Sequence, residues 1–272
     1  MFKVFLDETY DNSKMFLMGA WKARADEWEH FSDAWDRELC SDKPIAYFKN
    51  HEAMGLNEEF RGWSEEDRDA KVLAMASVIA KYELTGFIGG VHLPNFKSIF
   101  EGSIVPRKAL RSIITFTEPY HWACNCVISG VLGYQLEIEK KPTEQVNFVF
   151  DDGVTELDDC IANYPKLLAV LPPNVKAIAG TIIPGNDKTI VALQAADLLA
   201  GQMLQEIREY GVRHPPLELM RKNRNIIIFN CLQSRPDLKN LSLINVAWAT
   251  KKLDKIKRQR EGKNKNRGRR EK

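Results

Sequence analysis

The sequence lacks long hydrophobic runs: none of its apolar stretches reaches the roughly 18 residues that a membrane-spanning helix needs. Its N-terminus, MFKVFLDETY, meets an acid at Asp7, which is too early for the apolar region of a secretory signal. We therefore expect a cytoplasmic protein with no membrane partner.

Motifs for several common kinds of site are missing as well. The five cysteines contain no C-x-x-C pair, and the five histidines form no H-x-x-x-H or His–Cys spacing typical of zinc ligands. No glycine-rich loop carries the Lys-Ser/Thr of a nucleotide-binding loop, and no G-x-S-x-G is present. The sequence thus predicts neither a disulfide framework nor a zinc site, a phosphate-binding loop or a serine nucleophile.

Charge is unevenly distributed along a chain of otherwise ordinary globular composition. With 44% hydrophobic residues in 272, the chain is expected to form a sizeable core. Residues 250–272 hold 12 Lys and Arg against 3 Asp and Glu, so the remainder of the chain is acidic overall. We interpret residues 1–248 as one α/β domain and residues 249–272 as a basic, disordered tail. Such a tail is either only solvated or contacts nucleic-acid phosphates, independently of their sequence.

Hydrophobic periodicity predicts strands and helices along residues 1–248. Two strands over 2–9 and 15–23 form a hairpin, and further strands are expected over 85–93, 144–150 and 176–184. Helices are expected over 25–39, 64–83, 120–141, 155–171 with a break near Pro165, 189–210, and 240–260 at the start of the tail. This order predicts an α/β fold in which a mixed sheet opens with an antiparallel hairpin and is flanked by helices.

The first strand ends in an acid that a hydrophobic element would not ordinarily carry. Phe5 and Asp7 share one face of the strand, so Asp7 is largely covered if the strand is central. A buried ionised carboxylate is costly unless it is paired or binds a metal. Glu8 points to the opposite face if the strand continues, and to the same face if it bulges. The alternative is an acid at a strand end beside a solvated turn.

The segment FVFDDG, residues 148–153, ends a buried strand with two adjacent aspartates. Asp151 follows the alternation of the strand and is the better ligand candidate, whereas Asp152 precedes Gly153 in a typical turn sequence. Taken alone, the pair indicates a turn rather than a catalytic site.

The late helix carries Gln194 and Asp197 three residues apart, and therefore on one face. The surrounding sequence ALQAADLLAG consists mostly of small residues, which lets the helix pack closely on its neighbour and lets the short Asp197 side chain reach a shared site. The alternative is a tightly packed helix with one solvated aspartate.

Together, Asp7, Asp151 and Asp197 predict a metal site, because gathered carboxylates repel one another without a cation. Mg²⁺ and Mn²⁺ take oxygen ligands of this kind. Two such ions activate water and stabilise the leaving oxygen in phosphodiester cleavage.

The motifs FLDET, FLMGA, FVFDD and LQAADLLAG together resemble domain-of-unknown-function family 3800 over residues 1 to about 210. The resemblance implies a ribonuclease H-like fold with a central first strand and a nuclease-type metal site. It assigns Asp7 and Glu8 to the first motif, Asp151 to the middle one, and Gln194 and Asp197 to the last. The chain has Thr-Tyr where the family usually continues with Ser-Gly after Asp-Glu.

Two functions follow as hypotheses. In the first, the chain is a metal-dependent nuclease in which the three aspartates bind Mg²⁺ or Mn²⁺. Glu8 then adds a ligand or orients water, and Gln194 bonds to a metal-bound water or to the substrate. In the second, the chain is a non-catalytic nucleic-acid-binding or assembly protein that uses the same fold and the tail of residues 250–272. A third reading gives the acids a structural ion or a polar network and makes the partner a protein.

Lys49 and His51 lie in the irregular stretch YFKNHE. Both either approach the acidic site or belong to a polar loop.

Overall fold

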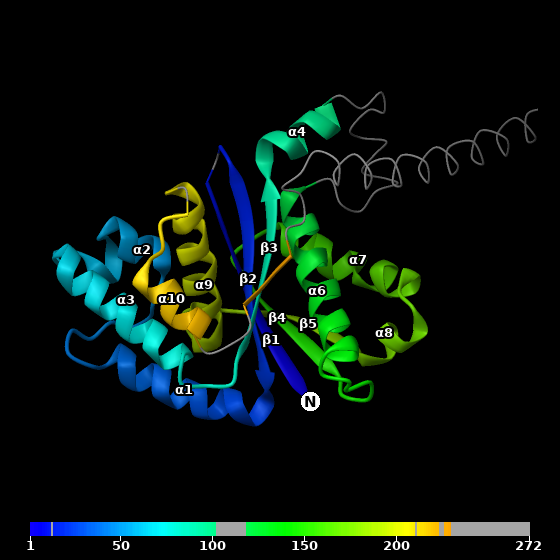
Figure 1. Ribbon diagram of the computed structural model, residues 1–272, viewed down its shortest axis with the longest axis horizontal. Coiled ribbons are helices and arrows are strands. Elements are labelled where there is room, and N and C mark those ends of the chain that lie inside the picture. Colours follow the sequence, from blue (N-terminus) through cyan, green and yellow to red (C-terminus); the bar gives the residue numbers. More distant parts are fainter. Residues whose placement is uncertain (12, 102–117, 210, 223–225, 230–272) are drawn as a thin grey trace, which may run out of the picture.

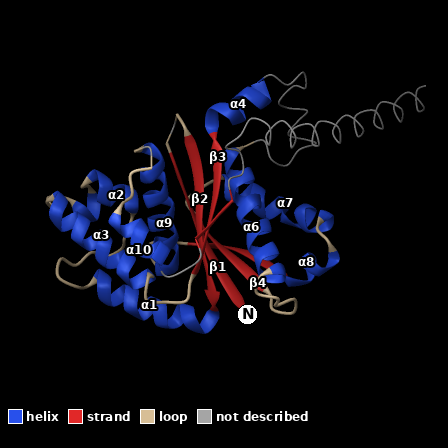
Figure 2. Cartoon of the chain, in the orientation of Figure 1, coloured by secondary structure: helices blue, strands red, loops and turns tan. Residues whose placement is uncertain are grey.

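A computed structural model describes residues 1–11, 13–101, 118–209, 211–222 and 226–229 of the chain. A six-stranded sheet lies between two layers of helices (Figures 1 and 2). The strands are β1 (Phe2–Tyr10), β2 (Met15–Arg24), β3 (Thr85–His92), β4 (Val146–Asp151), β5 (Ala179–Gly185) and β6 (Ile226–Phe229). The helix expected over 240–260 and the basic tail lie outside the described residues.

The strand order is β5-β4-β1-β2-β3-β6, which makes β1 a central strand. β2 is antiparallel to both β1 and β3, whereas β1 with β4, β4 with β5, and β3 with β6 are parallel pairs. A central first strand with an antiparallel hairpin on one side and parallel strands on the other is the ribonuclease H-like arrangement. The predicted fold class is therefore confirmed.

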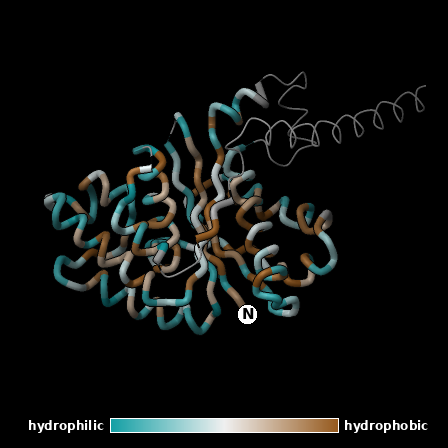
Figure 3. Tube along the Cα trace, in the orientation of Figure 1, coloured by the Kyte–Doolittle hydropathy of each residue, from teal (hydrophilic) through white to brown (hydrophobic). Residues whose placement is uncertain are grey.

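The helices cover both faces of the sheet, as Figure 1 shows. On one face lie α1 (Ala25–Leu39), α2 (Asn50–Gly55), α3 (Glu65–Ile79), α9 (Val191–Arg208) and α10 (Pro215–Lys222). On the other lie α6 (Pro119–Glu137), α7 (Glu156–Val170) and α8 (Pro173–Ile178), while α4 (Leu93–Glu101) extends β3 beyond the sheet. Hydrophobic residues concentrate along the strands and hydrophilic ones toward the outer helices (Figure 3).

Strand alternation in β1 produces the two hydrophobic cores. Val4 and Leu6 pack with the α6 layer, whereas Phe5 packs with the α9 layer. In α1, the apolar side chains recur every three or four residues and all are buried: Trp28, Phe31, Trp35 and Leu39. The predicted start of α3 is confirmed, since the Ser64 side chain accepts a hydrogen bond from the Asp67 amide at 3.1 Å.

Several predicted boundaries differ from the structure. The helices expected over 64–83 and 120–141 end earlier, at Ile79 and Glu137. Two further differences involve proline: α7 continues through Pro165, which is exposed, although proline cannot donate the hydrogen bond of a helix interior. The strand expected over 176–184 begins only at Ala179, because residues 173–178 form α8. α8 begins with Pro173, a residue favoured in the first helical turn because its missing N–H costs nothing there.

Within the described residues, no helix combines the length and apolarity needed to cross a bilayer. Cys40, Cys124 and Cys160 are free thiols.

Candidate metal centre

Three buried aspartates meet at one edge of the sheet: Asp7 lies within β1 just past its pairing with β4, Asp151 ends β4, and Asp187 follows β5. One carboxylate oxygen from each of Asp7, Asp151 and Asp187 lies within 4.8 Å of the other two. The three residues are 7%, 8% and 5% exposed. Across the described parts of the chain, no other group of three or more His, Cys, Asp or Glu residues meets the same spacing.

Strand register explains why these side chains converge. Leu6 is paired with Phe150 across the parallel strands, so Asp7 and Asp151 come next on adjacent strands. Both follow the alternation onto the α9 face, to which Phe5 and Val149 also contribute. Asp187 lies two residues beyond Gly185, the partner of Asp151 on β5. The carboxyl ends of parallel strands thus place the three acids at one edge of the sheet.

The turn after β4 gives the Asp151 carboxylate its space. The Asp152 amide donates to the Gly185 carbonyl at 2.9 Å, which fixes the turn. A Cβ atom on Gly153 would lie 2.9 Å from Asp151 Oδ2, a distance that real Cβ atoms do not show. Gly153 therefore serves the site by leaving room for the neighbouring aspartate.

Glu8 lies on the opposite face of β1. The strand continues regularly to Tyr10, and Glu8 is paired with Met18, whose side chain belongs to the α6-side core. The Glu8 amide donates to Asp7 Oδ1 at 2.8 Å. Burial raises the pKa of Glu8 to about 7, and the charge of Asp151 contributes to the rise. Glu8 is thus close enough to interact with the aspartates from the other side of the strand.

The late helix packs closely on the sheet, as its small residues predict. A Cβ atom on Gly19 of β2 would lie 2.8 Å from the Ala196 carbonyl oxygen and 2.9 Å from the Ala200 Cβ. This approach brings α9 against the strand that pairs with β1. Asp197 is consequently buried beside the site, and its charge is the strongest neighbouring contribution to the raised pKa of Asp7.

Gln194 and Asp197 both bind backbone groups. Gln194 is 1% exposed, its Oε1 accepts from the Trp35 indole and the Phe48 amide, and its Nε2 donates to the Asp187 carbonyl. Asp197 Oδ2 accepts from the Asn50 amide at 2.6 Å. Asp187 therefore completes the three-carboxylate group in the place expected for Asp197, and both Oε1 and Nε2 of Gln194 hydrogen-bond within the protein.

The carboxyl groups of Asp7, Asp151 and Asp197 have raised pKa values because they are buried and lie close to other carboxylates. Burial raises the pKa of Asp7 well above its usual value, and the charges of Asp197, Glu8, Asp151 and Asp187 raise it further. Burial also raises the pKa of Asp197 to about 7, although the Asn50 amide opposes this. The pKa of Asp151 rises with burial and the charge of Asp187. Without a cation, the site therefore holds protons that an exposed aspartate would have lost.

Lys49 is the one residue of the irregular stretch YFKNHE that enters this group. Its Nζ lies 2.6 Å from Asp187 Oδ2. Burial alone would lower the pKa of Lys49, but the hydrogen bond to Asp187 and the charges of Asp187, Asp151 and Asp7 raise it above the usual value. His51, on the first turn of α2, is exposed instead.

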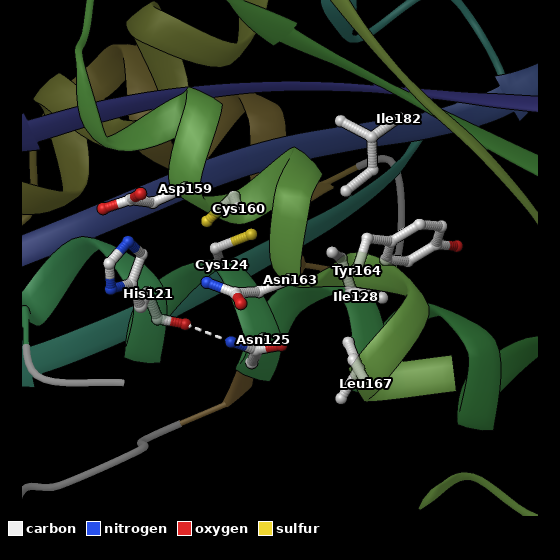
Figure 4. Close-up of a pocket in the computed structure, with 10 residues that line it drawn as sticks. All are labelled: His121, Cys124, Asn125, Ile128, Asp159, Cys160, Asn163, Tyr164, Leu167 and Ile182. Atoms are coloured by element: carbon white, nitrogen blue, oxygen red, sulfur yellow. Dashed lines mark hydrogen bonds between the residues drawn. The ribbon is translucent and has the colours of Figure 1, made fainter. Parts of the chain in front are cut away.

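A small cavity lies between α6, α7 and β5, and Asp7, Asp151 and Asp187 are not among its lining residues (Figure 4). His121, Cys124, Cys160 and Tyr164 are among its lining residues. Its volume of about 10 Å³ is roughly that of one water molecule. A nucleotide does not fit there, so the aspartates at the strand ends remain the candidate for chemistry.

Comparison with known proteins adds little to this geometry. No family model matches the chain, and no curated protein matches its sequence. Among solved structures, the chain is similar to a mutant protein of Bst-RNase HIII, with a TM-score of 0.37 and 11% identity. The likeness covers 76% of this chain and 53% of that one, so the chain spans about half the length of that protein. The fold assignment rests on the strand order and directions.

Proposed function

We propose that the chain is a metal-dependent phosphodiesterase of ribonuclease H-like type that cleaves nucleic acid, and that it belongs to domain-of-unknown-function family 3800. The observation that carries the proposal is the convergence of Asp7, Asp151 and Asp187 at the ends of three parallel strands. Buried acids gathered in this way are costly unless a cation binds them, and carboxylate oxygens are the ligands that Mg²⁺ and Mn²⁺ prefer.

The residues present fit such an ion. With bonds of about 2.1 Å, opposite oxygens around Mg²⁺ lie about 4.2 Å apart. The carboxylates already lie within 4.8 Å of one another, so small side-chain shifts would bring one oxygen of each within bonding distance of a single ion, with water filling the remaining positions. Asp7, Asp151 and Asp187 would hold the ion, and Asp197 borders it from α9. The positive charge would also reverse the local field and favour ionised carboxylates.

A divalent ion at this place would supply a Lewis acid and an activated water for attack on a phosphodiester. The chain itself contributes the geometry. The Glu8 amide donates to Asp7 Oδ1 at 2.8 Å, so the backbone of Glu8 orients this carboxylate while its side chain lies on the other face of β1. Gln194 holds the Asp187 backbone through its 2.8 Å hydrogen bond and so keeps one carboxylate in register with the strands.

The basic residues 250–272 suit the same proposal. Their net positive charge would bind phosphates without regard to sequence and would offset the acidity of residues 1–249 toward a polyanion. Deleting residues 250–272 should therefore weaken nucleic-acid binding most at low salt.

Cleavage of a panel of single- and double-stranded RNA and DNA in Mn²⁺ tests the proposal. Asp7→Asn and Asp187→Asn should each lose at least about 100-fold in rate, because a metal site contributes several kcal/mol to catalysis. Asp152→Asn is the matched control, since this aspartate neighbours Asp151 but is exposed in the turn. Equal cleavage by Asp187→Asn and the control would overturn the assignment. Nucleic-acid binding without cleavage would favour the non-catalytic hypothesis.

A further inference from the structure

The segment that carries Lys49 is attached to α9 at both of its neighbours. The Phe48 amide donates to Gln194 Oε1 at 3.1 Å, and the Asn50 amide donates to Asp197 Oδ2 at 2.6 Å. Both acceptors are buried on α9, three residues apart on one helical face. Lys49 lies between these two anchored amides, so its backbone position is fixed relative to the site.

The same glutamine also holds the partner of Lys49. Gln194 Nε2 donates to the Asp187 carbonyl at 2.8 Å, while its Oε1 accepts from the Phe48 amide. A single buried amide thus bridges the backbones on either side of the ion pair between Lys49 and Asp187. Gln194 and Asp197 on α9 therefore fix the position of the Lys49 ammonium relative to the carboxylates.

The charge balance of the site and the exposure of its side chains indicate a role for the Lys49 ammonium. The side chain of Lys49 is 24% exposed and that of Asp187 is 7% exposed, so the lysine is the more solvent-accessible partner of the pair. When Asp7, Asp151 and Asp187 are ionised, one ammonium leaves two negative charges uncompensated. A divalent cation bound to Asp187 would share that carboxylate with Lys49, so the pairing of the ammonium with Asp187 would weaken and the ammonium could face an incoming anion.

We propose that Lys49 is the phosphate-contacting residue of the site: its ammonium pairs with Asp187 in the metal-free protein and with a non-bridging phosphate oxygen of the nucleic acid once a divalent cation occupies the carboxylates. Gln194 and Asp197 are its positioning residues. This assignment rests on the proposed function for the identity of the substrate. It also requires Lys49 and the metal ion to compete for the same negative charge.

Two binding measurements on the full chain test the assignment without relying on cleavage. Lys49→Met should bind Mn²⁺ roughly tenfold more tightly in calorimetry, because a neighbouring positive charge has been removed. In Ca²⁺, the same variant should bind a single-stranded DNA oligonucleotide roughly tenfold more weakly, with the slope of log affinity against log salt reduced by about one. Lys49→Arg keeps the charge and should restore both values to near those of the wild type.

Lys188→Met is the matched control. Lys188 adjoins Asp187 in sequence, but its ammonium lies 4.6 Å from the centre of the Tyr47 ring and its side chain is exposed. It should leave the Mn²⁺ affinity unchanged. Circular dichroism of each variant, with and without Mn²⁺, establishes that the proteins compared are folded.

The outcomes separate the two proposals. Unchanged or weaker Mn²⁺ binding by Lys49→Met would overturn the shared-charge assignment, and unchanged DNA binding would overturn the phosphate contact. If Lys49→Met shows both expected shifts and the wild-type protein cleaves nothing, the role of Lys49 stands and the nuclease proposal is removed.

Discussion

Replacing Asp197 with asparagine should change how the stability of the metal-free protein depends on pH. Asparagine retains an oxygen that can accept the 2.6 Å hydrogen bond from the Asn50 amide, so Asp197→Asn removes the charge and keeps the contact. The pKa of Asp197 is about 7 in the folded chain, against an ordinary value of 3.8, chiefly because the carboxyl is buried. The folded state therefore holds a proton that the unfolded chain has already released.

Proton linkage gives the sign and the size of the change in unfolding free energy that Asp197 causes between two pH values. Between about pH 4 and pH 7 the folded state binds more protons than the unfolded state, so stability falls as pH rises through this window. Each unit of pKa difference corresponds to about 1.4 kcal/mol. Between pH 5 and pH 8 the wild type should lose on the order of 2 kcal/mol through this residue, and the asparagine variant should not.

Urea unfolding followed by tryptophan fluorescence in EDTA at pH 5 and pH 8 measures the effect. The stability of Asp197→Asn relative to the wild type should rise by about 2 kcal/mol from the lower to the higher pH. Comparing two pH values cancels any constant effect of the substitution on packing. A relative stability that is the same at both pH values, or that falls as pH rises, would refute the reasoning.

Three further substitutions concern glycines, of which Gly19 and Gly153 permit close approach. Gly19→Ala should lower the free energy of unfolding by about 1–3 kcal/mol, because its Cβ would lie 2.8 Å from the Ala196 carbonyl oxygen. In α6, a Cβ on Gly133 would meet nothing within 4 Å, so Gly133→Ala should raise the free energy of unfolding by about 0.5–1 kcal/mol. Urea unfolding measures both variants. The same change in unfolding free energy for Gly19→Ala and Gly133→Ala would contradict close packing of α9. Gly153→Ala should weaken Mn²⁺ binding about tenfold, because its Cβ displaces the Asp151 carboxylate, a ligand of a site worth several kcal/mol. Calorimetry that finds wild-type Mn²⁺ affinity would remove that steric argument.

The strand pattern was sufficient to predict two of the three converging acids. Alternation in β1 assigns Asp7 to the face of Phe5, and the run FVFDDG assigns Asp151 to the end of a buried strand. A parallel pairing of these strands then makes the two acids neighbours, as the register shows. Local periodicity is informative here because both residues continue regular strands.

The strand pattern could not predict that Asp187 joins the site or which groups Gln194 binds, and the reasons are physical. Asp187 lies in the turn sequence GNDKT, where an Asn-Asp pair reads as ordinary turn chemistry. Its signal was its place two residues beyond a third parallel strand, because such strand ends share one edge of a sheet. The backbone amides that donate to Gln194 and Asp197 lie 146 and 147 residues away in sequence, and backbone donors leave no signature in residue types.

Anomalous diffraction from crystals of the wild-type protein soaked in Mn²⁺ near pH 7.5 would show whether the three aspartates hold a metal ion. We expect an anomalous peak about 2.2 Å from carboxylate oxygens of Asp7, Asp151 and Asp187. We also expect that the Lys49 ammonium no longer pairs with Asp187 in that structure. Absence of a peak beside these three aspartates, with Mn²⁺ bound elsewhere on the chain, would contradict the proposed metal site.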